Sequence, residues 1–481
     1  MLHGHAKIEL TNGSTGEKEV IEHDNLVTNA LQYLVSEDPM GMWYFRSPDY
    51  PYGNGLFDGG FPILPIIQNS IGGVLCFADP LEENVNSIYA DAANVITARS
   101  SNDVNPNANP VRGSMNLSES GKIEKGYRFV FDFTTSQGNG QISSIALTSR
   151  QGGKVGYGDN YNDGRRDDFI VLPGFSFYKS GNIDGLKCLQ EYEYVYELSD
   201  GYAKTVLCPA PKTIELTKLY GFPFGTIPLN ATLYPTGTKR ETVTLTTTVF
   251  GSAFDKVRFY GNFCDGEDGF LYGFEATSNQ FSGNSSGNAT INWIKINKET
   301  NSFTEGTWTL PNVYLKGVGY RWLSTTAFQC SFIVQNGYVY FMAYDKKSIY
   351  KINTLDPTDI LQINSNFEMT STSGRYSSCA NYFFKIGNII RGRNYVLQCD
   401  KIERVANSAS SNSYEDFQSA YPNFQQKIYS IMTNGTSSDQ IGFCPVVASA
   451  YLATIFNLDQ PVQKTADKTM KITYSITEAT E

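Results

Sequence analysis

The chain has 481 residues, which is more than one compact domain usually holds, so the sequence predicts two or three domains. Its net charge is −10, and its Arg165-Arg166 pair is followed at once by Asp167-Asp168. Because clustered lysine and arginine bind phosphate backbones, this composition excludes nucleic acid as the expected partner. No apolar run approaches the ~20 residues of a membrane span, and no signal peptide is recognised. We therefore expect no membrane span and synthesis in a cytoplasm.

The composition favours strands over helices. Aromatic residues make up 14% of the chain, glycine is plentiful (43 residues), and charged residues reach only 18%, below the roughly 25% of ordinary soluble domains. This mixture is typical of β-strands joined by tight turns, so an all-β fold is predicted. The eight cysteines show no C-x-x-C spacing. That pattern argues against zinc or thioredoxin-type sites and favours buried, reduced thiols.

The N-terminal segment predicts a β-hairpin followed by a helix. Residues 6–10 and 17–22 are strand-like, and glycine turns separate them. Apolar residues then recur at helical spacing, so one short helix is expected near residues 25–36, with Asp24 or Asn25 as its N-cap.

Further strands are predicted at residues 127–133 and 141–147, which form a hairpin around Gly138-Asn139-Gly140. Near the C-terminus, residues 468–476 alternate strictly between apolar and polar side chains, as a half-buried strand does. Such a strand needs a sheet to join, and the N-terminal hairpin is the natural partner. We therefore expect a β-sandwich-like attachment domain made of residues 1–160 and 440–481.

The central residues 165–435 contain a loose repeat of short strands. Residues 269–274 resemble residues 337–342, and the phrase Trp-Ile-Lys-Ile-Asn at 293–297 resembles Ile-Tyr-Lys-Ile-Asn at 349–353. Units of about 40–50 residues with four strands suggest the blades of a β-propeller. A second sandwich with accidental similarity is the alternative.

Three stretches carry a resemblance to a known group of proteins. They are residues 6–34 (with Glu-Leu-Thr-Asn and Asn-Leu-Val-Thr-Asn), residues 131–148, and residues 452–477 (with Pro-Val-Gln-Lys-Thr and Thr-Met-Lys-Ile-Thr-Tyr). These resemble structural proteins encoded by phages and prophages of Gram-positive gut bacteria. They cover less than a fifth of the chain, and the centre resembles no family. The resemblance implies terminal regions bound to the virion, an exposed variable centre and no catalytic motif.

Exposed aromatic side chains are the first candidate binding residues, because sugar rings stack on Tyr and Trp. Two clusters lie outside the regular strand patterns, one at residues 43–52 and one at residues 320–322. Their candidate residues are Trp43, Tyr44, Tyr50, Tyr52, Tyr320 and Trp322. The alternative is that these rings fill cores, as most aromatic side chains do.

Histidine is scarce, with His3, His5 and His23 as the complete set. This scarcity argues against Ser-His-Asp and Cys-His enzymes, and a non-enzyme without cofactors is expected. His3 and His5 would lie on the same side of a strand and could bind a transition metal, or they could be incidental residues of a flexible arm. The acidic segments 159–168 and 265–269 depart from a calcium loop and are interpreted as solvated turns.

Together these features predict a virion structural protein, most simply a tail, baseplate or tail-fibre component. Its partners would be other virion proteins, copies of itself, and a glycan or protein of the host cell surface. Its location would be the virion, with the tail favoured. The alternatives are a capsid fibre or head decoration protein, and a glycan depolymerase carried by the virion.

Overall fold

A computed structural model describes most of the chain. The described residues are 2–36, 71–91, 93–105, 109–156, 169–171, 194–199, 201–222, 240–251, 263–276, 288–318, 329–330, 332–370, 383–386, 389–392, 394–404, 415–424, 427–434, 441–448 and 450–478. The chain divides into two compact units: Met1–Pro173 with Ile386–Ile389 and Val446–Glu481, and Gly174–Lys385 with Ile390–Pro445. Nearly all of their regular structure is β, so the all-β fold class is confirmed.

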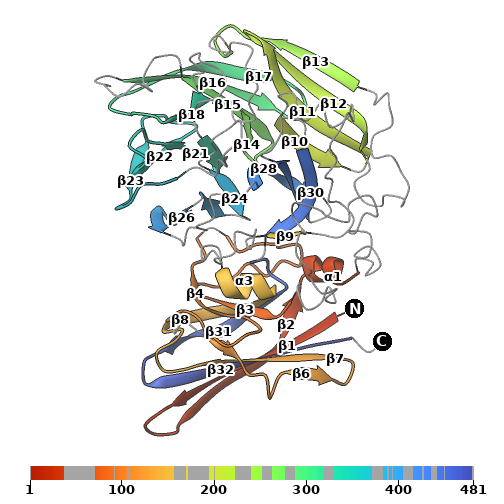
Figure 1. The fold of residues 1–481 in the computed structure, drawn as a ribbon, viewed down its shortest axis with the longest axis vertical. Coiled ribbons are helices and arrows are strands. Elements are labelled where there is room, and N and C mark those ends of the chain that lie inside the picture. The colour runs from red at the N-terminus through yellow and green to blue at the C-terminus, as the bar shows by residue number, and fades with distance from the viewer. Residues whose placement is uncertain are drawn as a thin grey trace. The chain divides into compact units, whose positions relative to one another are not determined.

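The first unit is built on one ten-stranded sheet (Figure 1). Its strands are β1 (Leu2–Asn12), β2 (Lys18–Val27), β3 (Gly73–Phe77), β4 (Ile96–Ser100), β5 (Ser114–Met115), β6 (Gly121–Ile123), β7 (Gly126–Phe133), β8 (Gly140–Thr148), β31 (Thr454–Lys464) and β32 (Lys468–Glu478). Their order is β4-β3-β8-β31-β2-β1-β32-β7-β5, and β6 pairs with β7. The backbone of Arg99 in β4 bonds to residues 111 and 113 just before β5, so the sheet is nearly closed into a barrel.

The strands from the two ends of the sequence lie side by side in this barrel. β1 pairs with β32 in antiparallel register from Leu2–Glu478 to Asn12–Lys468. Both strands alternate between buried and more exposed residues, and the apolar face of β32 predicted from its alternation lies in the core. The prediction that the C-terminal strands complete the N-terminal domain is therefore confirmed.

The sheet encloses an apolar core to which both ends of the sequence contribute. Ile8 of β1, Phe131 of β7, Ile145 of β8 and Ile472 of β32 are at most 1% exposed. A sandwich-like core was predicted, and here the opposing walls belong to one curled sheet. Strand twist and the bulged pairing of β31 with β8 allow a single sheet to cover its own apolar face.

The predicted N-terminal helix begins later than its sequence pattern suggests. α1 covers Asn29–Ser36, because Leu26 and Val27 extend β2 and pair with Ile455 and Thr454 of β31. The predicted caps are therefore wrong, and the hydroxyl of Thr28 accepts the N–H of Leu31 instead. A second short helix, α3 (Arg150–Val155), is capped by Ser149 and was not predicted.

The stretch from residue 169 to residue 448, most of which belongs to the second unit, contains the propeller-like repeat, and we call it the propeller-like unit. Within the described residues it has five four-stranded sheets. They are β10 (Tyr194–Ser199), β11 (Gly201–Ala210), β12 (Thr213–Phe222), β13 (Arg240–Thr246); β14 (Phe263–Asp265), β15 (Phe270–Ala276), β16 (Ala289–Asn297), β17 (Phe303–Leu310); β20 (Phe332–Gln335), β21 (Tyr338–Met342), β22 (Ser348–Asn353), β23 (Ile360–Asn364); β24 (Phe384–Ile386), β25 (Ile389–Arg391), β26 (Tyr395–Gln398), β27 (Lys401–Arg404); and β28 (Glu415–Phe424), β29 (Lys427–Asn434), β30 (Ile441–Ala448), β9 (Phe169–Val171). Two further short strands, β18 (Gly317–Val318) and β19 (Gln329–Cys330), pair with each other.

The sheets follow one another as propeller blades do. The first strand of the first sheet, β10, contacts both β14 and β28, and β14 contacts β20. The fifth sheet takes its outer strand, β9, from a segment that precedes β10 in the chain. Propellers are commonly closed by a strand from the other end of the repeat, because backbone hydrogen bonds then hold the first and last parts of the repeat together.

The sequence repeat corresponds to the second and third strands of neighbouring sheets. Lys295 on β16 lies 4.1 Å from the ring centre of Phe270, and its counterpart Lys351 on β22 lies 4.5 Å from that of Tyr338. The asparagine that ends each repeat phrase, at 297 and 353, accepts backbone N–H groups of the following turn. The repeat therefore records a strand pair and the turn chemistry that ends it.

Candidate functional site

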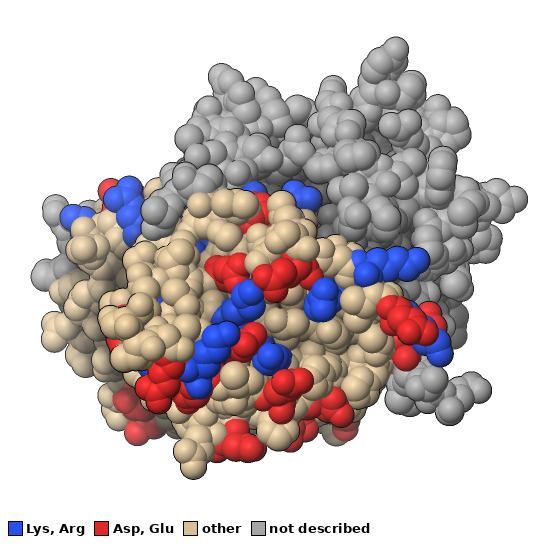
Figure 2. Space-filling model, turned by 90° about the horizontal axis from the view of Figure 1, so that it is seen from below, with Lys and Arg blue, Asp and Glu red and all other residues tan. Residues whose placement is uncertain are grey.

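The outward face of the barrel carries the polar side chains of β1, β2, β32 and β7. Along β1 the outward positions are His3, His5, Lys7, Glu9 and Thr11, which alternate with buried residues. Figure 2 shows basic and acidic side chains interspersed over this side of the molecule. A surface of both signs favours specific ion pairing with a protein over attraction to a uniformly charged polymer.

All three histidines of the chain are paired with carboxylates on this unit, in a group that we call the histidine–carboxylate patch. Asp24 Oδ1 lies 3.0 Å from His5 Nδ1, and Glu22 Oε1 lies 3.0 Å from His5 Nε2. Asp24 also lies 3.4 Å from His3. The remaining histidine, at position 23, lies 3.6 Å from Asp459 of β31.

The pairing of His5 changes its proton affinity. The hydrogen bond that His5 donates to Asp24 raises the pKa of His5 above the usual 6.5, burial opposes this, and Glu22 adds to the increase. The same contact with His5 lowers the pKa of Asp24 below 3.8. The folded chain therefore binds a proton at His5 more tightly than the unfolded chain does, and the imidazolium can bridge two carboxylates of the neighbouring strand.

Replacing His5 with glutamine should change how stability depends on pH. Because the pKa of His5 is higher in the folded chain, its contribution to the free energy of unfolding is complete below pH 6.5. That contribution is lost as the pH rises through the pKa of His5 in the folded chain. Because the pair is exposed, the effect should be at most about 1 kcal/mol. Urea unfolding from pH 5 to 9 should show a smaller loss of stability with rising pH in the variant. In an Asp24→Asn background, the effect of His5→Gln should shrink, and an unchanged effect would contradict this assignment.

The predicted metal residues lie on one face of β1, as an H-x-H pair in a strand should. Their ring nitrogens face Asp24 and Glu22, which the site hypothesis did not include. In the part of the chain that the structure describes, no group of three or more His, Cys, Asp or Glu side chains has an arrangement able to hold a metal ion.

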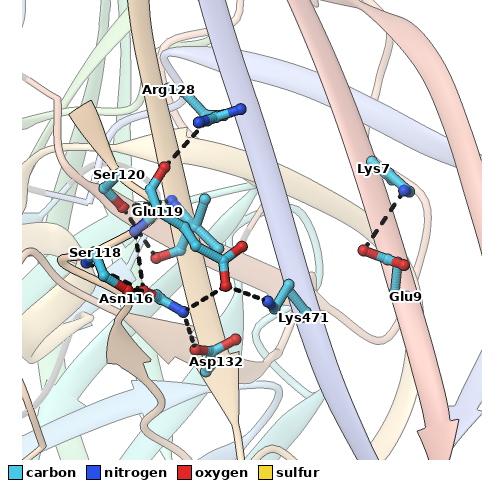
Figure 3. Close-up of polar contacts among 10 residues, drawn as sticks. Lys7, Glu9, Asn116, Ser118, Glu119, Ser120, Arg128, Asp132 and Lys471 are labelled. Carbon is cyan, nitrogen blue, oxygen red and sulfur yellow. Dashed lines mark hydrogen bonds and ion pairs between the residues drawn. The ribbon is translucent and has the colours of Figure 1, made fainter. Parts of the chain in front are cut away.

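A second polar cluster fixes the segment between β5 and β7 against the barrel (Figure 3). Lys471 of β32 donates to Glu119 at 2.6 Å, and Asn116 donates to both Glu119 and Asp132. Arg128 donates to the backbone oxygen of Glu119. The contact with Lys471 holds the pKa of Glu119 below its usual range. This cluster ties the loop to β7 and β32 and gives the outward face a defined shape.

The other predicted site residues lie outside the described residues. This holds for the candidate aromatic residues Trp43, Tyr44, Tyr50, Tyr52, Tyr320 and Trp322, and for the acidic segment 159–168. The segment 265–269 is described and forms the turn from β14 to β15. The interpretation as a solvated turn is wrong at Asp265, which is buried and accepts hydrogen bonds from Lys298 at 2.9 Å on both carboxylate oxygens.

The cysteine prediction is confirmed at one position and wrong at another. Cys76 is buried in β3, and burial raises the pKa of its thiol. Cys399 is exposed in the turn between β26 and β27, with a positive φ of 49°.

The carboxylates of the histidine–carboxylate patch were missed by sequence reasoning, although a signal was present. Once the hairpin is predicted, its register determines which residues lie opposite each other, and here His5 lies opposite Asp24 and Lys7 opposite Glu22. Cross-strand neighbours at such positions are close enough to pair. Reading the hairpin for register would have found both carboxylates.

Comparison with known proteins gives no family for the chain. No family model matches it, and no curated protein matches it. Among solved structures, apo AztD from Citrobacter koseri covers 82% of this chain and 98% of its own, at 10% identity and a TM-score of 0.21. A crystal structure of Citrobacter koseri AztD covers 96% and 100%, at 10% identity and a TM-score of 0.17. Likenesses at these TM-scores carry no argument about this chain. Among the described residues, no helix is both long and apolar enough to cross a membrane.

Proposed function

We propose that the chain is a structural protein of a bacteriophage particle, a tail, baseplate or fibre component. In this proposal the first unit, which holds the ten-stranded sheet and which we call the barrel unit, attaches to the virion. The propeller-like unit binds a glycan or protein of the host surface. The phrases that resemble phage structural proteins support the origin, and they all lie in the barrel unit. The chain would act by attachment and recognition and would be no enzyme.

One observation supports the assignment of attachment to one unit and of binding to the other. The pairing of β1 with β32 brings the two ends of the described chain together in one sheet, so the propeller-like unit is inserted between barrel strands. An inserted unit can vary in sequence without disturbing the sheet that holds it, because its connections enter and leave on the same scaffold. A conserved attachment and a variable binding unit can therefore coexist in one chain.

The arrangement of the histidines supports a role without catalysis. Each histidine pairs with at least one carboxylate in the histidine–carboxylate patch, with His3 and His5 on the outward face of β1 and His23 exposed on β2. A Ser-His-Asp hydrolase needs its histidine beside a nucleophile, and neither serine nor cysteine is a partner in these pairs. The depolymerase alternative would then depend on a carboxylate pair.

Immunoelectron microscopy with antibodies against the chain tests the location. Label on the tails of particles is expected. Label on heads would favour the alternative of a capsid fibre or decoration protein, and particles without label would overturn the proposal.

A second assay addresses the depolymerase alternative. The purified chain is incubated with host cell-wall polysaccharide, and reducing ends are measured over time. No release above a heat-treated control is expected. Release that depends on a single carboxylate would overturn the non-enzymatic reading while leaving the virion location intact.

A further inference from the structure

Strand β2 has an edge that its own sheet leaves largely open. On the side away from β1, the pairing with β31 covers Leu26 and Val27 alone among the described residues. The stretch before them is exposed: Lys18, Glu19, Val20, Glu22, His23 and Asp24. Val20 is 49% exposed, although valine is a residue that sheets usually cover. An open strand edge presents unpaired N–H and C=O groups to a further strand.

The hairpin pairing shows which backbone groups are directed at that edge. The N–H of Asn12 donates to the oxygen of Glu17, which closes the hairpin. Hydrogen-bonded pairs alternate in an antiparallel ladder, so the odd-numbered residues of β2 bond to β1. The even-numbered residues, from Lys18 to Asp24, then direct their backbone groups to the open edge.

Edge strands are commonly charged, and charge alone normally prevents pairing. In β2 the order of charges allows pairing with an identical strand. If two copies meet in antiparallel register with the two-fold axis at Ile21, Lys18 lies opposite Asp24 and Glu19 lies opposite His23. Each of these pairs occurs twice, and Val20 lies opposite Glu22.

Neighbouring registers are less favourable. Shifting the axis by one residue towards Glu22 places that carboxylate opposite its own copy, which is repulsive. Shifts by half a residue would set the outward face of one barrel against the inward face of the other, because side chains alternate along a strand. Shifting the axis to Val20 places Lys18 opposite Glu22 but shortens the paired part of β2 to residues 18–22, because Asp24 would then lie opposite Gly16 in the hairpin turn, where φ is +72°.

From these features we propose that two copies of this chain associate through β2, in an antiparallel pairing with the two-fold axis at Ile21. The two barrels would then share one continuous sheet. The existing contacts of His23 with Asp459 and of Asp24 with His5 are exposed ion pairs, which exchange partners at small cost. This dimer rests on the proposed function only in so far as that function expects copies of the chain to associate, and it adds where two copies would meet.

A cross-linking experiment tests the register. In a Cys399→Ser background, which removes the thiol that is exposed among the cysteines whose side chains the structure describes, Ile21→Cys is introduced. At the axis of the proposed pairing the two Cα atoms of residue 21 would be about 4.5 Å apart, which a disulfide can span. Oxidation should give a covalent dimer. Leu117→Cys, at a residue of the same unit that is 65% exposed, is the matched control and should stay monomeric.

Charge exchange tests the specificity of the pairing. Lys18→Asp or Asp24→Lys alone places like charges opposite each other twice, and either should weaken association on the order of tenfold in sedimentation equilibrium. The double variant restores opposite charges and should recover most of the loss. Circular dichroism and urea unfolding of each variant show whether the barrel has stayed folded.

A monomer at concentrations on the order of 100 μM, with no cross-link at residue 21, would overturn the inference. A dimer in which the double variant gives no recovery would overturn it too, because the contact would then lie elsewhere. If the monomeric chain were still found on phage tails, the proposed function would stand. If a residue 21 dimer formed but particles carried no label, the inference would stand and the proposed function would fail.

Discussion

Replacing Lys464 with methionine is expected to lower the free energy of unfolding of the barrel unit by about 3 kcal/mol. Lys464 ends β31 and is 0% exposed. Its ammonium donates to the backbone oxygens of Thr134 and Thr135 at 2.7 and 3.1 Å, and to Oδ1 of Asn139 at 2.7 Å. These acceptors belong to the turn between β7 and β8, so one side chain ties that hairpin to β31.

The expected loss of unfolding free energy follows from the three oxygens that Lys464→Met leaves without a donor. Burial lowers the pKa of Lys464 to about 8, so the side chain is still mostly charged at neutral pH. Hydrogen bonds to a charged group contribute about 1.5–3 kcal/mol each, and the recovered cost of burying the ammonium offsets part of their loss. Methionine keeps the length of the side chain but gives the three oxygens no donor.

Calorimetry together with hydrogen exchange at β7 and β8 provides the measurement. The two-unit chain need not unfold in one step, so exchange is needed to locate the change in the barrel. Lys468→Met is the matched control, because Lys468 is partly exposed and lies 3.5 Å from Glu19. The control should change stability by no more than about 0.5 kcal/mol. Equal effects of the two substitutions would contradict the anchoring role of Lys464.

Local patterns predicted the elements of the fold well where a strand has one buried face. The alternation in β32 and the turn of the first hairpin are visible in the sequence, and both agree with the pairing of β1 with β2 and β32. The repeat phrases likewise marked strands that occupy equivalent positions in two sheets. Period and turn chemistry are local properties, so a single sequence contains them.

Contacts between distant segments were beyond this reasoning. Lys464 is followed by a turn and reads as an ordinary polar strand end, yet its acceptors lie more than 300 residues earlier in the chain. The extension of β2 through Val27 has the same origin, because Ile455 and Thr454 of β31 provide the partners. Helical spacing predicted otherwise, and tertiary pairing overrode the local preference.

The candidate site shows the same division. The sequence indicated that His3 and His5 share a face, and hairpin register could have added Asp24 and Glu22. The link from His23 to Asp459 depends on how β31 passes β2, which no local pattern encodes.

Replacing Glu305 with glutamine is expected to destabilise the propeller-like unit by about 1–2 kcal/mol at neutral pH. Glu305 lies on β17, and its carboxylate accepts the backbone N–H groups of Thr248, Val249 and Phe250 at 2.7, 3.0 and 2.8 Å. The hydroxyl of Thr248 adds a fourth contact at 2.7 Å. These donors follow β13, so the side chain joins the first sheet of the unit to the second. Glutamine replaces one carboxylate oxygen of Glu305 with an NH₂ group, which cannot accept hydrogen bonds. Two of the four hydrogen bonds are therefore lost.

The effect should depend on pH in a known direction. Burial alone would raise the pKa of Glu305, but the N–H groups of Phe250 and Thr248 outweigh it and hold the pKa below 4.5. The carboxylate therefore contributes its full stability above pH 4.5, and this contribution is lost as the pH falls through the lower folded value. Urea unfolding of both proteins from pH 7 to 3 should show the difference shrinking at the acid end. Glu299→Gln, in an exposed turn of the same sheet, is the matched control and should show no such trend. A difference for Glu305→Gln that stays constant down to pH 3 would mean that the charge of Glu305 does not hold the two sheets together.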